Sequence, residues 1–157
     1  MRRNLPALLS FNGGYVDTAG FLALHGLFTA HVTGNFVTLG ATFAFGTTGA
    51  VAKLLALPVF CLTVMLAGAM SYRLSEAGAP VLRVMLGVQV LLLALGAAMA
   101  IRLGPLTDGD DWTAVATGLT LVAAMSIQNA LHRLHLSDAP PSTLMTGTGH
   151  PVHAATG

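Results

Sequence analysis

Asp17 is the residue whose type and position most clearly suggest chemistry. It lies near the middle of an apolar stretch, Leu5–Leu27, that is long enough to cross a bilayer as a helix. An ionised carboxylate at the centre of such a helix costs about 2.5–3.5 kcal/mol on insertion scales, so it is rarely kept there without a use. Gly13 and Gly20 flank it on the same helical face, where small residues leave room for a helix, water or a ligand.

Two interpretations of Asp17 follow from this position. In the first, it is a proton or cation site that titrates as a substrate moves. In the second, its role is structural, and the carboxylate pairs permanently with an arginine or accepts hydrogen bonds from a broken helix.

A second polar feature is the sequence His-Val-Thr-Gly-Asn at residues 31–35, between two apolar stretches. Thr33, Gly34 and Asn35 could expose backbone N–H and C=O groups to a ligand, as the ends of broken helices do. Alternatively, Thr33 or Asn35 is the N-cap of the following helix and Gly34 only permits the turn.

The second half of the chain repeats this arrangement of polar groups. Asp17 precedes Thr33 by 16 residues, and Asn129 precedes Thr146 by 17. In both halves the polar residue is followed by a Leu/His stretch, a short break, and then a hydrophobic residue directly before Thr-Gly. The candidate ligand or ion site therefore draws on both halves: Asp17, Thr33, Gly34, Asn35, Gln128, Asn129, Thr146 and Gly147.

No catalytic or metal-binding pattern accompanies these residues. His132 and His135 form an H-x-x-H pair, but no Cys, Asp or Glu on the same helical stripe completes a metal site. Nothing resembles a nucleophile elbow, a Walker loop, a dinucleotide fingerprint or a zinc-protease helix. The sequence therefore predicts a protein that is not an enzyme and has no cofactor.

Composition indicates that the solvent of this chain is a lipid bilayer. Hydrophobic residues make up 54% of the chain and charged residues only 8%, against about 25% charged in an average soluble domain. So few charges could not cover the surface of a water-soluble domain. The net charge of +1 also excludes a strongly basic nucleic-acid binder.

The elements that must position the candidate residues are membrane helices. We predict one all-α transmembrane domain over residues 1–157, with about five to six hydrophobic helices. Residues 54–72 and 84–101 are apolar enough to span. They separate repeat unit one, at about 5–51, from an incomplete unit two, at about 112–157.

The basic residues favour one of two topologies for residues 33–51. If this segment crosses the membrane fully, four basic residues face the cytoplasm and three face outside, which decides nothing. If it dips in and returns, the numbers become five and two, a better fit to the positive-inside rule. The cytoplasmic set is then Arg2, Arg3, Arg73, Arg83 and Arg133, and the outer set is Lys53 and Arg102. We favour this re-entrant topology, which gives a cytoplasmic N-terminus and inverted repeats.

The stretch "GYVDTAGFLALHGLFTAHVTGNFVTLG" resembles the N-terminal signature of the YoaK-like family of bacterial inner-membrane proteins. The later "MSIQNALHRL" and "STLMTGT" are similar to its second signature. The resemblance extends from about Ser10 to Thr148 and implies a multi-pass membrane protein of unassigned biochemical function. Members of that family usually continue with a further membrane helix or two, whereas this chain ends "GHPVHAATG". The resemblance therefore implies a C-terminally truncated copy.

From these observations we predict a small-solute or proton-coupled transporter-like protein. Asp17 and Asn129 would be its intramembrane polar pair, and the two Thr-Gly turns would face the ligand. The alternative is a non-transporting membrane scaffold or partner-binding protein, whose polar residues only hold helices together. The expected partners are the lipid bilayer, a small solute or proton, and a second copy of the chain.

Overall fold

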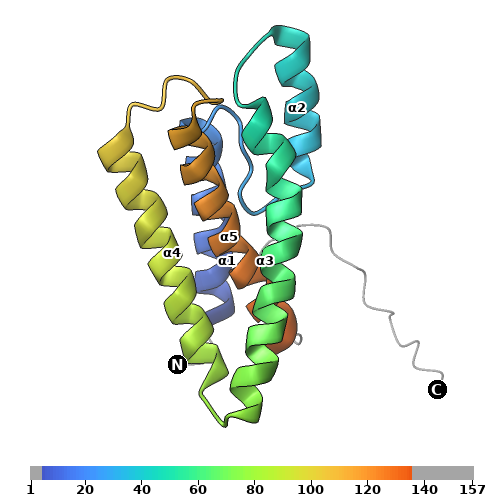
Figure 1. Cartoon of the computed structure of the whole chain (residues 1–157), viewed down its shortest axis with the longest axis vertical. Helices are drawn as coiled ribbons and strands as arrows, with labels where there is room; N and C mark the ends of the chain where they lie inside the picture. The colour runs from blue at the N-terminus through green and yellow to red at the C-terminus, as the bar shows by residue number, and fades with distance from the viewer. Residues whose placement is uncertain (1–4, 136–157) are drawn as a thin grey trace, which may run out of the picture.

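The computed structural model describes residues 5–135, which form five α-helices joined by turns. The helices are α1 (Leu5–Ala23), α2 (Gly34–Phe45), α3 (Ala50–Glu76), α4 (Val81–Leu103) and α5 (Trp112–His135). Helices α1, α3, α4 and α5 lie side by side as a bundle, and α2 lies beside the first part of α3 (Figure 1). The described residues contain no strand, so the predicted all-α fold is confirmed.

A histidine in the left-handed conformation ends α1, and a glycine ends α2. Helix α1 stops at Ala23 because His25 adopts a left-handed backbone, with φ of 54°, and the Gly26 N–H returns to the Phe21 carbonyl at 2.9 Å. This is the hydrogen-bond pattern of a Schellman cap. The apolar stretch predicted to continue to Leu27 therefore contains the first break. Gly46, with φ of 66°, ends α2 in the same left-handed conformation.

Helix α5 lies in the centre of the bundle. Of its most apolar window, 67% is buried, against 22% for α3 and 17% for α4. It packs against α1, α3 and α4, and it is the one described helix whose backbone lies close to that of α1. The polar groups that α5 carries are therefore enclosed by protein, while α3 and α4 present most of their surface outward.

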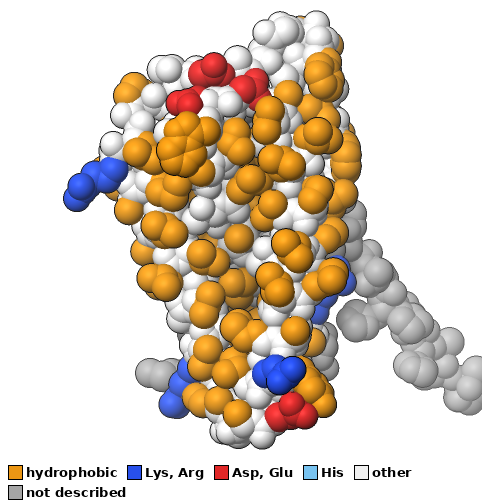
Figure 2. Space-filling model, viewed as in Figure 1, with side chains coloured by type: hydrophobic (Ala, Val, Ile, Leu, Met, Phe, Trp, Pro, Cys, Tyr) orange, Lys and Arg blue, Asp and Glu red, His pale blue; other side chains and the backbone are white. Residues whose placement is uncertain are grey.

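The outward surface is that of a membrane protein. Helices α3, α4 and α5 are each long and apolar enough to span a bilayer. Large apolar side chains stand exposed on every helix, and Figure 2 shows them covering the middle of one face, with charged side chains near its two ends. The predicted spans at residues 54–72 and 84–101 lie within α3 and α4.

Residues 24–46 enter and leave the bundle at the same end. His25 Nε2 lies 2.8 Å from the Leu106 carbonyl oxygen, and Gly109 N–H donates to Thr48 Oγ1 at 2.9 Å. The turns before and after α2 therefore meet the same α4–α5 loop. Between them the chain descends beside α1 and turns back along α2 (Figure 1). A re-entrant segment requires such a path, out and back from one end of the bundle, but the topology of residues 33–51 in a membrane stays a prediction.

Helices α1 and α5 run in opposite directions (Figure 1), which is the relation that an inverted repeat requires. The second half of repeat unit two, with Thr146 and Gly147, lies outside the described residues. The internal repeat and the truncation of the chain therefore stay predictions.

Candidate functional site

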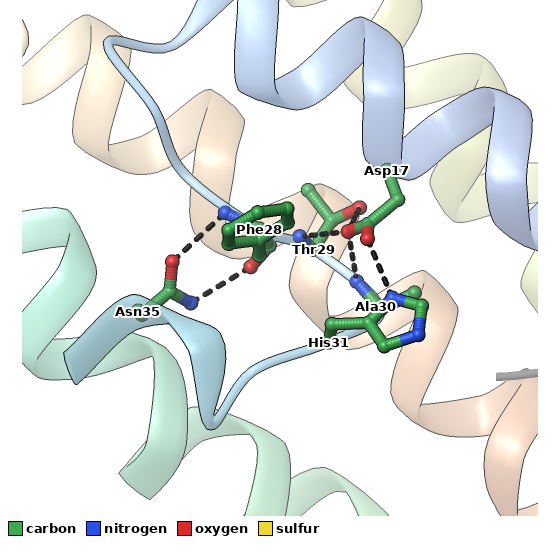
Figure 3. Close-up of polar contacts among 6 residues, drawn as sticks. All are labelled: Asp17, Phe28, Thr29, Ala30, His31 and Asn35. Atoms are coloured by element: carbon green, nitrogen blue, oxygen red, sulfur yellow. Dashed lines mark hydrogen bonds and ion pairs between the residues drawn. The ribbon is translucent and has the colours of Figure 1, made fainter. Parts of the chain in front are cut away.

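The Asp17 carboxylate holds the break between α1 and α2. Its Oδ1 accepts hydrogen bonds from the backbone N–H groups of Thr29 and Ala30, both at 2.7 Å, and from Thr29 Oγ1 at 3.3 Å. All three bonds are buried. Figure 3 shows the Asp17 carboxylate of α1 facing the non-helical residues 24–33, which we call the extended segment. These bonds match the structural interpretation of Asp17, in which its carboxylate accepts hydrogen bonds from a broken helix.

The second carboxylate oxygen meets a histidine. Asp17 Oδ2 lies 2.7 Å from His31 Nδ1, and the two side chains are 8% and 39% exposed. A carboxylate only accepts hydrogen bonds, so His31 Nδ1 carries the hydrogen when Asp17 is ionised. The other ring nitrogen, Nε2, has no hydrogen-bond partner within residues 5–135. In the neutral ring, Nε2 is then a free acceptor.

Asn35 fastens the same segment from the other side. Its Oδ1 accepts from the Phe28 N–H and its Nδ2 donates to the Phe28 carbonyl, both at 2.8 Å. The amide thus pairs with one residue as a neighbouring strand would, and Asn35 is only 1% exposed. Its hydrogen bonds go to the chain itself, and it is not an N-cap.

Thr33 and Gly34 contribute geometry more than side-chain chemistry. Thr33 precedes the first helical residue of α2, but its side chain makes no capping hydrogen bond. A Cβ on Gly34 would lie 3.0 Å from the Phe28 ring. A Cβ on Gly20 would lie 2.8 Å from Thr29 Cγ2. The two glycines therefore allow the extended segment to lie close to α1 and α2.

A cavity of about 600 Å³, more an open surface hollow than an enclosed space, lies beside the Asp17–His31 pair. Its lining comes from the outer face of α1 and from the extended segment: Gly14, Asp17, Thr18, Phe21, Leu22, Phe28, His31 and Gly34. Most of this lining is apolar. Phe21 and Phe28 form a tilted ring pair with centroids 4.9 Å apart. The break thus presents one polar pair at the edge of an aromatic, glycine-lined hollow.

Gln128 belongs to a different polar cluster, between α1, α4 and α5. Its Oε1 accepts from Asn12 Nδ2 at 2.8 Å and from Gln89 Nε2 at 2.7 Å. Its Nε2 donates to the Leu9 carbonyl at 2.8 Å. Because Nε2 must face that carbonyl, the orientation of the amide is fixed. Gln128 ties three helices together and does not line the cavity.

Asn129 does not join Asp17 in a polar pair. Its Oδ1 accepts from Arg133 Nε at 3.1 Å. Asn12 of α1 lies opposite Gln128 of the antiparallel α5, so Asp17 lies about 7.5 Å further along α1, in the direction away from Asn129. The structure therefore brings Asp17, Gly34 and Asn35 together but leaves Gln128 and Asn129 elsewhere.

Sequence reasoning missed the partners that complete the site. His31 and Phe28 were not among the candidate residues. Neither was Lys53, a buried lysine that does not line the cavity and whose Nζ donates to Thr42 Oγ1 at 2.6 Å. The signal for His31 was present, because an ionisable side chain within a membrane segment marks a functional site by default.

The fold and site define an all-α membrane protein in which a buried carboxylate holds the non-helical segment between α1 and α2. The chain belongs to the family described as "Protein of unknown function (DUF1275)", which matches residues 5–151. That match includes both Thr-Gly signatures. The narrower likeness to YoaK-like proteins stays a prediction. No curated protein and no solved structure matches the chain.

Proposed function

We propose that this membrane protein is a small-solute transporter whose solute site is the cavity at the break and whose proton site is His31. The observation that carries the proposal concerns His31, at the edge of a 600 Å³ hollow. One ring nitrogen is held by Asp17, and the other has no partner among residues 5–135. Solute pockets of about 300–1,000 Å³ with few polar groups are typical of ligand sites. Broken helices at such sites recur in secondary transporters.

In this proposal Asp17 is a positioning residue. It fixes the His31 ring through Nδ1, as carboxylates orient histidines in other sites. It also fixes the backbone from Thr29 to His31. A proton moves on and off His31 Nε2, and the carboxylate balances the charge of the protonated ring.

A second candidate function rests on a different observation. The hydrogen bonds of Asp17 Oδ1, Asn35 and Gln128 all go to the chain's own groups. Polar residues used in this way hold helices together and need no ligand, which favours a membrane scaffold or partner-binding protein. The two functions differ in whether His31 is needed for solute-dependent proton movement.

The test is proton flux in vesicles that contain the full chain and a trapped pH-sensitive dye. Gradients of ethanolammonium, mannitol and gluconate supply a cationic, a neutral and an anionic probe. We expect at least one of them to move protons above the level of protein-free vesicles, and His31→Gln to abolish that flux. Tyr72→Phe, an exposed position on α3, should retain it. A folded chain without flux for all three probes, or equal flux in His31→Gln, refutes transport and favours the scaffold.

We also propose that the end of the bundle with the start of α1 faces the cytoplasm, in a bacterial inner membrane. Arg73 and Arg83 flank the α3–α4 turn at this end, and Arg133 lies near the end of α5. Lys53 and Arg102 lie towards the other end, near the acidic α4–α5 loop. This distribution follows the positive-inside rule.

A further inference from the structure

We propose that the cavity binds a primary organic ammonium ion, and that this cation and a proton compete for His31 Nε2. The inference rests on the proposed function, because it names the substrate class of the same cavity.

The charge of the site favours a cation. With Asp17 ionised and His31 neutral, the pair carries one negative charge, which one ammonium ion or one proton neutralises. The other lining residues are uncharged: Gly14, Thr18, Phe21, Leu22, Phe28 and Gly34. An anion would therefore meet no positive charge except a protonated His31, and Asp17 already balances that charge.

The hydrogen-bonding group of the site requires a donor. Because Asp17 holds Nδ1–H, the neutral His31 ring offers an acceptor at Nε2. A primary ammonium has three N–H donors and can give one to Nε2. Protonation of Nε2 turns this acceptor into a donor and adds a second positive charge, so the proton and the ammonium ion exclude each other.

The aromatic lining suits the same ligand. Phe21 and Phe28 lie on the same hollow as His31, and their rings form a tilted pair. The faces of aromatic rings attract organic cations and pack well against apolar groups. The site therefore combines a cation-binding pair with an apolar surface for the rest of the ligand.

No other titratable group within the described residues competes for His31. Helix α2 contains none, and α5 contains none from Thr113 to Leu131. Lys53 Nζ of α3 donates a hydrogen bond to Thr42 Oγ1. His25 Nε2 is hydrogen-bonded to the Leu106 carbonyl of the α4–α5 loop. The pH dependence of ligand binding should therefore come from the Asp17–His31 pair.

Four probes that share a phenyl ring test the inference by calorimetry on the full chain in nanodiscs. The heat measured with empty nanodiscs is subtracted. The probes are benzylammonium, benzyltrimethylammonium, benzyl alcohol and benzoate. We expect benzylammonium to bind at least about tenfold more tightly than the trimethyl and alcohol probes, which lack either an N–H donor or a charge. Benzoate should not bind. Any probe that equals or exceeds benzylammonium overturns the inference, as does the absence of benzylammonium binding.

Proton competition gives a second readout. If a proton and the ligand compete for His31 Nε2, benzylammonium affinity should fall as the pH is lowered, by up to about tenfold per pH unit, with up to one proton released per ligand bound. His31→Gln should abolish binding. Phe21→Leu should weaken it several-fold, while the matched Phe43→Leu, exposed on α2 and outside the cavity, should not. Affinity that is independent of pH, or retained in His31→Gln, overturns the competition.

These results are separable from those for the proposed function. His31-dependent proton flux driven only by mannitol or gluconate retains a transporter but overturns the ammonium ligand. Ammonium binding without flux retains the ligand site and refutes transport.

Discussion

Replacing Asp17 with alanine should detach the segment around Thr29 and Ala30 from α1 and destabilise the protein. The substitution removes the acceptor of two buried backbone N–H groups, those of Thr29 and Ala30, each bonded at 2.7 Å. An orphaned buried donor costs about 1–3 kcal/mol, so the two together should lower the free energy of unfolding by about 2–6 kcal/mol. Few single substitutions away from a core cavity have so large an effect.

Asp17→Asn is the informative comparison, since an asparagine oxygen can still accept from both N–H groups. It loses the charge, which strengthens each bond by about 1 kcal/mol, and its Nδ2 replaces the oxygen that accepts from His31 Nδ1, so we expect a loss of at least about 2 kcal/mol. Thr18→Ala, on the exposed neighbouring position, should change little.

The assay is unfolding of the full chain in mixed micelles of mild detergent and dodecyl sulfate, followed by circular dichroism. Asp17→Ala should be the least stable of the three variants. If Asp17→Ala equals Asp17→Asn in stability, the two backbone bonds do not hold the break and the structural reasoning fails.

Three further predictions concern packing, the amide cluster and topology. Gly20→Ala should destabilise by about 1–3 kcal/mol, because the new Cβ would lie 2.8 Å from Thr29 Cγ2. Gln128→Leu should cost at least about 2 kcal/mol in the same assay, since it breaks the three interhelical bonds described above, each worth about 0.6 kcal/mol in a membrane. Single cysteines at Ala7 and Ala77 should react with an impermeant thiol reagent from one side of the membrane, and a cysteine at Thr47 from the other.

Each of these has a matched control. Gly68→Ala, with no atom within 4 Å of the added Cβ, should be neutral or stabilising, because alanine is the better helix former. Gln89→Leu breaks only the bond from Gln89 to Gln128. If it lowers the free energy of unfolding more than Gln128→Leu does, Gln128 is not the centre of the amide cluster. The cysteine series is made in a Cys61→Ala background, and labelling of Ala7 and Thr47 from the same side would favour a full crossing of residues 33–51.

The membrane class and the long helices were readable because they depend on composition and length. A charge-free run such as 54–72 has one stable structure in lipid, and α3 contains it. The turns on both sides of α2 meet the same α4–α5 loop, which is compatible with the topology that the basic residues of the short loops favoured. Membrane class and helix length are sums over many residues, so no side-chain contact has to be known to predict them.

The partners of individual polar residues were not readable in this way. Asp17 was singled out by its charge, but pairing it with Asn129 assumed that the repeat brings equivalent residues together. Instead, the backbone of Thr29 and Ala30 satisfies the carboxylate, and every residue type offers that N–H group. Sequence alone carries no mark for such a partner, because it arises only when Gly20 lets the segment approach α1.

The spacing of hydrogen-bond partners along the chain has a consequence for the order of events during synthesis. The partners of Asp17 follow it by only 12 to 14 residues, so the costly carboxylate can be satisfied almost as soon as it is made. Asn12 bonds to Gln128, 116 residues later. At about 5–20 residues per second, α1 waits roughly 6–23 s for α5, the helix it packs against. The Asp17 carboxylate can therefore form its hydrogen bonds early in synthesis. The neutral Asn12 amide is without its Gln128 partner until α5 has been made.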